Sequence, residues 1–264
     1  MPYLGFNSIS LATNEANSHY NSLQVEFRSQ MRHALTLHVA YTLSRAIDGG
    51  GASQFGSDGQ DLGGVSNPYA GWLYDVGPSQ YDRTNILLTN LIYDLPFFKN
   101  SSSRFMKTAL GGWTVSGVVI AESGLPINVG ISGARSVNGL PNATNRPDLS
   151  GSISYPHTVS TTLEQSIQWI SPSAFSLPTL GGWGNLGYDA ARGPGRDNWD
   201  LSLFKSFIFS ENRGSKFELR VETFNTWNHT EFNAVSSRFG ASNFGQVTSA
   251  FDPRVFQLGG KLYF

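Results

Sequence analysis

Five histidines, at positions 19, 33, 38, 157 and 229, are the residues of this sequence best suited to acid–base or metal chemistry. They are scattered without metal-ligand spacing, and the His-Glu-x-x-His pattern of zinc hydrolases is absent. No cysteine is present, which removes disulfides, zinc thiolates and cysteine nucleophiles. A Gly-x-Ser-x-Gly elbow, a P-loop and a dinucleotide fingerprint are also missing. We therefore expect no enzyme, no cofactor and no metal site.

Two groups of charged residues are the remaining candidates for chemistry. Asp58 and Asp61 lie in a glycine-rich stretch, but their spacing does not fit a calcium-binding EF-hand loop, so a solvated turn is expected. Glu218, Arg220 and Glu222 stand at alternate positions, which would place them on one face of a strand. These residues could form ion pairs with neighbouring strands, or the two carboxylates could act in catalysis. Ion pairing is favoured, because the interior of a barrel is normally polar.

The element that must carry this charged row is a β-strand, because apolar and polar residues alternate with period 2 along much of the chain. Residues 35–44 show the pattern clearly, with apolar residues at every odd position and mostly polar ones between them. The sequence predicts an all-β, antiparallel transmembrane β-barrel segment that forms an open, curved sheet, a partial barrel. About eight strands are expected, at 3–12, 23–28, 35–44, 84–95, 112–122, 197–207, 216–224 and 254–264.

The connections between these strands alternate in length. Short links lie near 31–33, 96–110 and 208–215, and long polar ones span 13–20, 46–82, 125–196 and 225–253. Short turns on one side and long loops on the other are typical of an outer-membrane barrel whose last strand ends in the periplasm. Residues 125–196 are too many for a plain connection. We expect local strands there, with residues 126–129 extending the strand before them.

Aromatic residues fall on the predicted apolar faces near the strand ends. Two aromatic girdles around an apolar band are what a lipid-facing barrel wall requires. The alternative is that these side chains fill the core of a soluble β protein. The residues expected at the membrane interfaces are Tyr41, Trp199 and Phe256 toward the external side, and Tyr93, Trp113, Phe207 and Phe217 toward the periplasmic side.

The charged residues of the other face must then avoid lipid. A charge on the lipid face costs about 2–4 kcal/mol at the midplane, so Glu26, Arg28 and His38 are predicted to line a wet interior. A histidine satisfied by neighbours is favoured over a ligand-binding one at position 38. Lys205 breaks the pattern, since it falls on the apolar face. In a soluble sheet the charged face would simply be the solvated one.

The last eight residues, Gln-Leu-Gly-Gly-Lys-Leu-Tyr-Phe, form a signature of their own. They resemble the signal that the barrel-assembly machine reads: polar, any, Gly, any, any, apolar, any, aromatic. Gln257, Gly259, Leu262 and Phe264 occupy the four specified places. An unpaired terminal strand can add to the edge of another sheet, with its alternate side chains giving specificity.

Composition agrees with this interpretation. Charged residues make up 14% of the chain, below the roughly 25% of soluble domains, and the net charge of −1 gives no nucleic-acid footprint. No run of 18 apolar residues predicts a transmembrane helix. The first residues do not have the pattern of a secretory signal, which an exported protein needs.

Longer segments are similar to the Oar-like subfamily of TonB-dependent receptors, whose members carry a carboxypeptidase-regulatory-like domain. The similarity runs along nearly the whole chain and is weakest in 131–185. The segments that carry it are 20–25, 40–48, 81–83, 111–113, 192–195, 198–205, 220–229 and 251–254.

This resemblance implies a barrel of many strands with an N-terminal plug, driven by the inner-membrane energy-coupling protein TonB. Because about eight strands and no plug are expected in residues 1–264, the chain is interpreted as the C-terminal part of such a receptor. Its implied partners are outer-membrane lipid, the barrel-assembly machine, TonB through the missing N-terminal part, and an unknown transported ligand. The loops at 46–82 and 125–196 would contact that ligand.

Two other functions remain open at this point. One is a stand-alone eight-stranded outer-membrane barrel with an adhesive or structural role, whose interior would be packed by side chains. The other is a soluble carbohydrate-binding β-sandwich that uses tryptophan and tyrosine for stacking. A sandwich predicts neither the terminal signature nor the separation of short and long loops.

Overall fold

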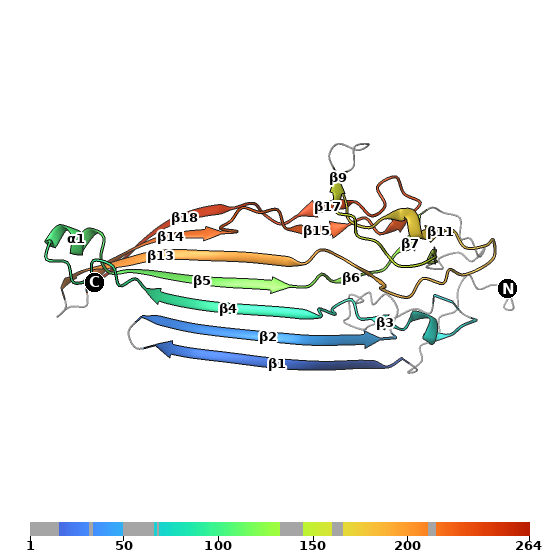
Figure 1. Ribbon diagram of the computed structural model, residues 1–264, viewed down its shortest axis with the longest axis horizontal. Helices are drawn as coiled ribbons and strands as arrows, with labels where there is room; N and C mark the ends of the chain where they lie inside the picture. The colour runs from blue at the N-terminus through green and yellow to red at the C-terminus, as the bar shows by residue number, and fades with distance from the viewer. Residues whose placement is uncertain are drawn as a thin grey trace.

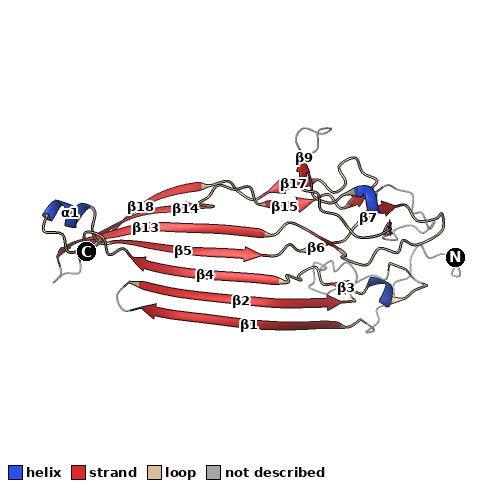
Figure 2. Ribbon diagram, in the orientation of Figure 1, coloured by secondary structure: helices blue, strands red, loops and turns tan. Residues whose placement is uncertain are grey.

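The computed structural model of the chain describes residues 16–31, 34–49, 66–67, 69–132, 145–159, 166–210 and 215–264. One antiparallel sheet dominates the molecule, with its long strands side by side and the connecting segments gathered at its two ends (Figure 1). Figure 2 shows strand along the whole sheet and helix only near the two ends. The described part is therefore nearly all β, as the alternation predicts.

Seven long strands form the body of the sheet, and their spatial order follows the chain. Each pairs antiparallel with the next, and the short strand β3 (Gly77–Pro78) adds to the far end of β2. The long strands, in spatial order, are β1 (Ser18–Met31), β2 (Leu35–Asp48), β4 (Asn85–Asp94), β5 (Trp113–Glu122), β13 (Arg196–Ser210), β14 (Ser215–Phe224) and β18 (Val255–Tyr263).

The register matches apolar residues with apolar residues across the sheet. Phe27 stands opposite Val39, and Leu37 stands opposite Leu91. Leu203 lies between Val115 on one side and a valine of β14 on the other. A slip of one residue in any pair would turn a whole set of apolar side chains to the other face, so the alternation itself fixes the pairing.

Seven of the eight predicted strands are present at the expected places, and the weak one at 3–12 lies outside the described residues. Strand β1 is longer than the strand predicted at 23–28, because its backbone stays paired with β2 from Ser18 opposite Asp48 to Met31 opposite Leu35. The sheet does not close on itself. β1 and β18 are its two edges in the described chain, which confirms the expected open sheet.

At one end of the sheet the long connections fold together into a compact loop unit, defined here as the described residues within 66–84, 123–195 and 225–254. It has its own apolar core of Val129, Ile170, Phe175, Leu186, Ala191 and Phe244. Its elements are η1 (Trp72–Asp75), β6 (Pro126–Ile127), β7 (Gly130–Ile131), β8 (Asp148–Leu149), β9 (Thr158–Val159), β10 (Ile167–Gln168), η2 (Pro172–Ala174), β11 (Phe175–Ser176), β12 (Ala191–Arg192), β15 (Phe232–Val235), β16 (Arg238–Phe239) and β17 (Val247–Ala250).

The expectation of local strands within 125–196 is confirmed, but residues 126–129 do not simply extend β5. That strand ends at Glu122, and β6 is a separate strand that pairs with β12. The backbone changes partner between them: Ser123 N donates to Asn85 O at 2.9 Å, whereas Leu125 O accepts from Gly193 N at 2.8 Å.

The opposite end of the sheet carries the helix α1 (Arg104–Ala109), within the link of residues 95–112. The C-terminus lies at this same end (Figure 1). The link was expected to be a short turn, and the helix was not predicted. Ser103 caps it, since its side-chain oxygen accepts a hydrogen bond from Met106 N at 3.5 Å.

No helix in the described part of the chain is long and apolar enough to span a membrane.

Candidate functional site: a two-faced sheet under a folded loop unit

One face of the sheet, called here the apolar face, presents a continuous apolar surface. Residues opposite one another in the register share a face, so the set can be followed from β1 to β18. Many of its side chains are open to the surroundings: Phe256 is 65% exposed, Leu258 73% and Leu262 60%. An exposed apolar surface of this extent requires a membrane or a partner. Its members include Leu23, Val25, Phe27, Leu35, Leu37, Val39, Leu43, Leu87, Leu91, Val115, Val119, Leu201, Leu203, Leu219, Val221, Leu258 and Leu262.

All seven aromatic residues predicted for the membrane interfaces lie on the apolar face by register, in two groups. Tyr41, Trp199 and Phe256 lie toward the loop unit. At the α1 end, Phe207 stands directly opposite Phe217, with ring centroids 6.4 Å apart. Tyr93 and Trp113 occupy the same end of β4 and β5. The described structure thus has the aromatic arrangement that two interfaces would need.

Lys205 also lies on the apolar face, and the link that carries α1 explains how. The link folds over this face, and the Lys205 ammonium donates to Thr108 O at 2.5 Å and to Gly111 O. Only 5% of the residue is exposed. The ammonium nitrogen lies 5.7 Å from the centroid of the Trp113 ring and 5.2 Å from that of the Phe207 ring. Carbonyl oxygens at a helix C-terminus carry partial negative charge, so the link both covers and compensates this cation.

The four residues predicted as an assembly signal lie on and beside the edge strand β18. Gln257 and Gly259 stand opposite Glu222 and Arg220 of β14 and share their face, whereas Leu262 belongs to the apolar face. Phe264 follows the strand and is fully exposed. The signal therefore occupies an edge whose other side has no partner strand among the described residues.

The opposite face, called here the polar face, carries the charged residues expected of it. The Glu26 carboxylate contacts both His38 Nε2 and the Arg28 guanidinium, so this histidine is satisfied by a neighbour. Arg220 bridges Glu218 at 2.8 Å and Glu222 at 3.4 Å. The predicted pairing of this row is therefore present, but within one strand rather than between strands, because alternate side chains on a face are close enough to meet.

The polar face also has two features that the alternation did not reveal. A hollow of about 400 Å³ lies where small side chains meet, with Ser116 opposite Ser202 and with Asp200 and Glu222 beside them. Next to it an apolar stripe crosses the middle of the face. The stripe consists of Ile86, Leu88, Ile92, Val118 and Ile120. The sequence signal that could have predicted it is the run of consecutive apolar residues in β4 and in β5, where both faces of the strand become apolar.

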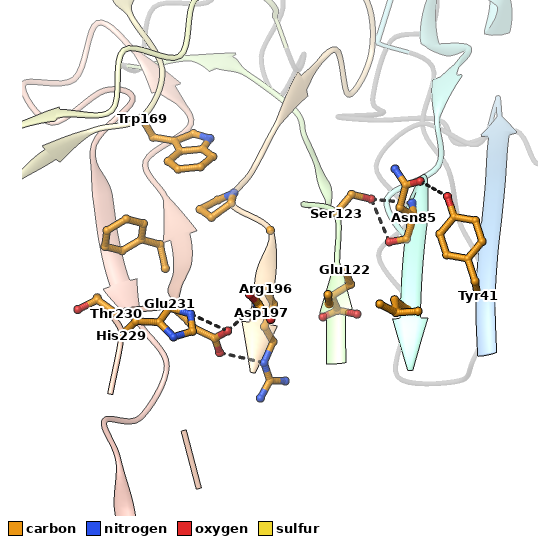
Figure 3. Close-up of a pocket in the computed structure, with 15 residues that line it drawn as sticks. Tyr41, Asn85, Glu122, Ser123, Trp169, Arg196, Asp197, His229, Thr230 and Glu231 are labelled. Carbon is orange, nitrogen blue, oxygen red and sulfur yellow. Dashed lines mark hydrogen bonds and ion pairs between the residues drawn. The ribbon is translucent and has the colours of Figure 1, made fainter. Parts of the chain in front are cut away.

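A second cavity, of about 500 Å³, lies between the sheet and the loop unit (Figure 3). Tyr41, Leu87 and Ala121 line it from the strands, and Trp169 and Phe232 line it from the loops. These three strand residues belong to the apolar face, but Glu122 and Arg196, which also line the cavity, stand opposite each other on the polar face. Side chains of both faces therefore reach this cavity at the end of the sheet. Its size suits a small ligand.

The charged groups of this cavity already have partners. The Glu231 carboxylate accepts from Asp197 N at 2.6 Å, pairs with Arg196 Nε at 3.2 Å and lies 3.5 Å from His229 Nε2. Tyr41 donates its hydroxyl to Asn85 Oδ1 at 2.6 Å. The cavity therefore offers aromatic surface and hydrogen bonds rather than a free charge or a poised catalytic pair.

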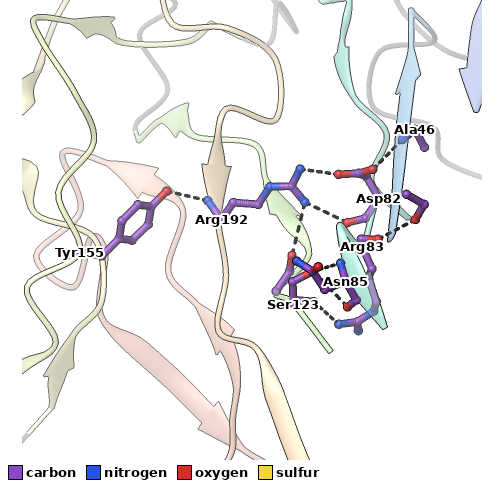
Figure 4. Close-up of polar contacts among 9 residues, drawn as sticks. Ala46, Asp82, Arg83, Asn85, Ser123, Tyr155 and Arg192 are labelled. Carbon is purple, nitrogen blue, oxygen red and sulfur yellow. Dashed lines mark hydrogen bonds and ion pairs between the residues drawn. The ribbon is translucent and has the colours of Figure 1, made fainter. Parts of the chain in front are cut away.

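Arg192 fastens the loop unit to the sheet (Figure 4). Its guanidinium contacts the buried Asp82 carboxylate and donates to Asp82 O at 2.9 Å, while its backbone N–H donates to the Tyr155 hydroxyl at 2.9 Å. Asp82 in turn accepts from the backbone N–H of Ala46, in β2, at 2.6 Å. One arginine thus ties the segment before β13 to the connection between β2 and β4 and, through its backbone, to Tyr155.

Asp189 gives the loop unit an expected pH dependence. Burial, and then repulsion from Asp48, raises the pKa of the Asp189 carboxyl from 3.8 to about 7. The folded state therefore holds this proton where the unfolded chain has lost it. The contribution of Asp189 to the stability of the loop unit is greatest below about pH 4 and falls as the pH rises to about 7.

We expect the loop unit to lose about 3 kcal/mol of stability between pH 5 and pH 8, and Asp189→Asn to abolish most of this loss. The backbone φ of 51° at this position suits asparagine. Amide-exchange protection factors for 166–192, measured in both proteins at the two pH values, check this. An unchanged pH dependence in the variant would contradict the assignment to Asp189.

The part of the chain that the structure describes contains no cluster of histidine and carboxylate side chains that could hold a metal ion. Asp58 and Asp61, considered for calcium, lie outside the described residues. Much of 46–82, and residues 133–144 and 160–165 within 125–196, also lie outside them. The expected ligand contacts of these loops therefore stay predictions.

Comparison with known proteins agrees with the two-faced sheet. No curated protein and no solved structure matches the chain. The family described as the outer membrane β-barrel domain matches residues 1–257, which is nearly the whole sequence. Long antiparallel strands, one lipid-suited face and loops gathered at the two ends are the features such a domain requires. The chain therefore belongs to the outer membrane β-barrel domain family.

Proposed function

We propose that the chain forms part of the wall of an outer-membrane transport receptor of the TonB-dependent class, which takes up a ligand captured by the loop unit. The observation that carries this proposal is the polar face, where ion pairs and a hollow of about 400 Å³ lie behind the apolar wall. A water-filled interior that admits a ligand and a plug has this character.

The open sheet also supports a larger wall. Unpaired backbone groups at a sheet edge cost several kcal/mol each in lipid, so β1 and β18 need further strands in a membrane. A stand-alone barrel closed by these strands is not what the structure forms. A soluble sandwich is excluded as the architecture of the described residues, because the long strands make a single sheet and not two packed ones.

Cysteine substitution tests the wet interior, since the chain has no cysteine of its own. Ser116 and Ser202 stand opposite each other on the polar face, and their neighbours Val115 and Leu203 form the matching pair on the apolar face. We expect a membrane-impermeant maleimide to label cysteines at 116 and 202 about tenfold faster than cysteines at 115 and 203 in intact outer membranes.

Energy coupling is tested in the native cells with the same cysteine at 202. Labelling from outside should rise when TonB is active and fall when its gene is deleted or the proton gradient is collapsed. Labelling at 202 that is fast in all three conditions would identify a passive pore. Labelling that is absent at both 116 and 202 would identify a packed structural barrel and would overturn the transport proposal.

A further inference from the structure

The link of residues 95–112, called here the α1 link, presents several apolar side chains to its surroundings. They are too numerous to be incidental in so short a segment: Phe105 is 77% exposed, and Phe97 is 62% exposed. Phe98, Met106 and Leu110 are between 42% and 48% exposed. Nothing in the described chain covers them.

Basic residues accompany this apolar surface, and acidic ones are absent. Lys99, Arg104 and Lys107 are all exposed, and the link contains no aspartate or glutamate. No carboxylate of the described residues forms an ion pair with any of the three. Apolar side chains flanked by cations are the pattern of a segment that lies in a membrane interface.

The position of the α1 link points to the same surroundings. Two residues of the apolar face hold its helical end: the Trp113 indole donates to Ala109 O at 3.1 Å, and the Lys205 ammonium donates to Thr108 O and Gly111 O. The link therefore lies over the lipid-suited face, and its exposed residues continue that face. It cannot swing away without leaving Lys205 uncovered in lipid, which is costly.

We propose that the α1 link is an interfacial anchor, with Phe105, Met106 and Leu110 in the acyl boundary and Lys99, Arg104 and Lys107 on anionic phospholipid headgroups. The leaflet is the one at the end of the sheet where the last strand ends, which is the periplasmic leaflet in the orientation predicted from the lengths of the connections. The anchor rests on the membrane placement of the sheet and not on transport, so either proposal can fail alone.

The test uses the full chain reconstituted into nanodiscs of phosphatidylcholine, with or without phosphatidylglycerol. A fluorophore on Phe105→Cys reports insertion, and the same fluorophore on Ser102→Cys, an exposed polar position of the same link, is the matched control. We expect shallow nitroxide-labelled lipids to quench the fluorophore at 105 and to leave the one at 102 unchanged. Equal quenching at the two positions would overturn the anchor.

The headgroup preference is tested by Lys99→Gln, Arg104→Gln and Lys107→Gln, singly and together. Each cation should strengthen the partitioning of the link onto phosphatidylglycerol nanodiscs about fivefold, and high salt should remove the difference. On pure phosphatidylcholine the variants and the parent should behave alike. A triple variant that is quenched as strongly as the parent on phosphatidylglycerol at low salt would overturn the role of the cations.

Discussion

Replacing Arg146 with methionine is expected to destabilise the loop unit by about 3–5 kcal/mol, because it leaves a buried carboxylate without its partner. The Arg146 guanidinium pairs with Asp75 at 2.7 Å, and both side chains are only 1% exposed. It also donates to Tyr74 O at 2.6 Å and lies 3.9 Å from the centroid of the Tyr74 ring. Removing the guanidinium would leave the Asp75 carboxylate without its countercharge and would open a gap between segments far apart in the sequence.

Amide exchange of residues 69–78 and 145–159 measures this effect while the sheet stays in place. The control is Arg28→Met, which removes an ion pair whose arginine side chain is 73% exposed and should therefore have little effect on stability. A double variant, Arg146→Met with Asp75→Leu, should recover most of the loss, because no buried charge remains unpaired. If Arg146→Met behaved like the control, the pair would not hold the loops together.

Deleting Phe264 is expected to abolish assembly into membranes while leaving the packing of the chain unchanged. The residue is fully exposed and lies outside the last strand, so its loss removes no internal contact. A large effect would therefore have to act through recognition of the terminal strand by the assembly machine.

Urea-unfolded chain added to liposomes that contain the purified machine gives the measurement, read as the protease-protected fraction. We expect about tenfold less protected protein after the deletion and less than about a twofold change for Phe256→Ala, an exposed aromatic of the same strand. In liposomes without the machine, both variants should insert as poorly as the parent. Equal yields of the deletion and the parent with the machine present would remove the assembly signal from consideration.

The long strands and the two faces of the sheet were predictable because both depend on a local pattern. A period of two decides which residues face together, and matching apolar faces then decides the register. Leu35, Leu37 and Val39 are an example: their spacing alone places them on one face, and the structure pairs all three with residues of β4 on that same face. The strand ends were less predictable, because backbone pairing continues beyond the residues that alternate, as in β1.

The loop unit and the α1 link were not predictable in the same way. Arg146 meets Asp75 across 71 positions of sequence, and nothing local to either residue signals the contact. Lys205 seemed an exception on the apolar face because its partners are carbonyl oxygens, which carry no sequence identity. The cap at Ser103 was a readable signal for the helix, but so short a helix gives little periodicity.

The shared packing of the loop unit has a mechanical consequence. Tyr74 donates to Gly184 O at 2.6 Å, and Trp169 N and Ile170 N both donate to Gly245 O, so three chain segments are bonded to one another. Close-packed cores shift between discrete arrangements rather than deforming smoothly. We therefore expect a pull on one segment to be carried to the other two, so that the unit responds to a load as a single stiff body. Any opening at this end of the wall would be an all-or-none event with a threshold, not a graded bending of independent loops.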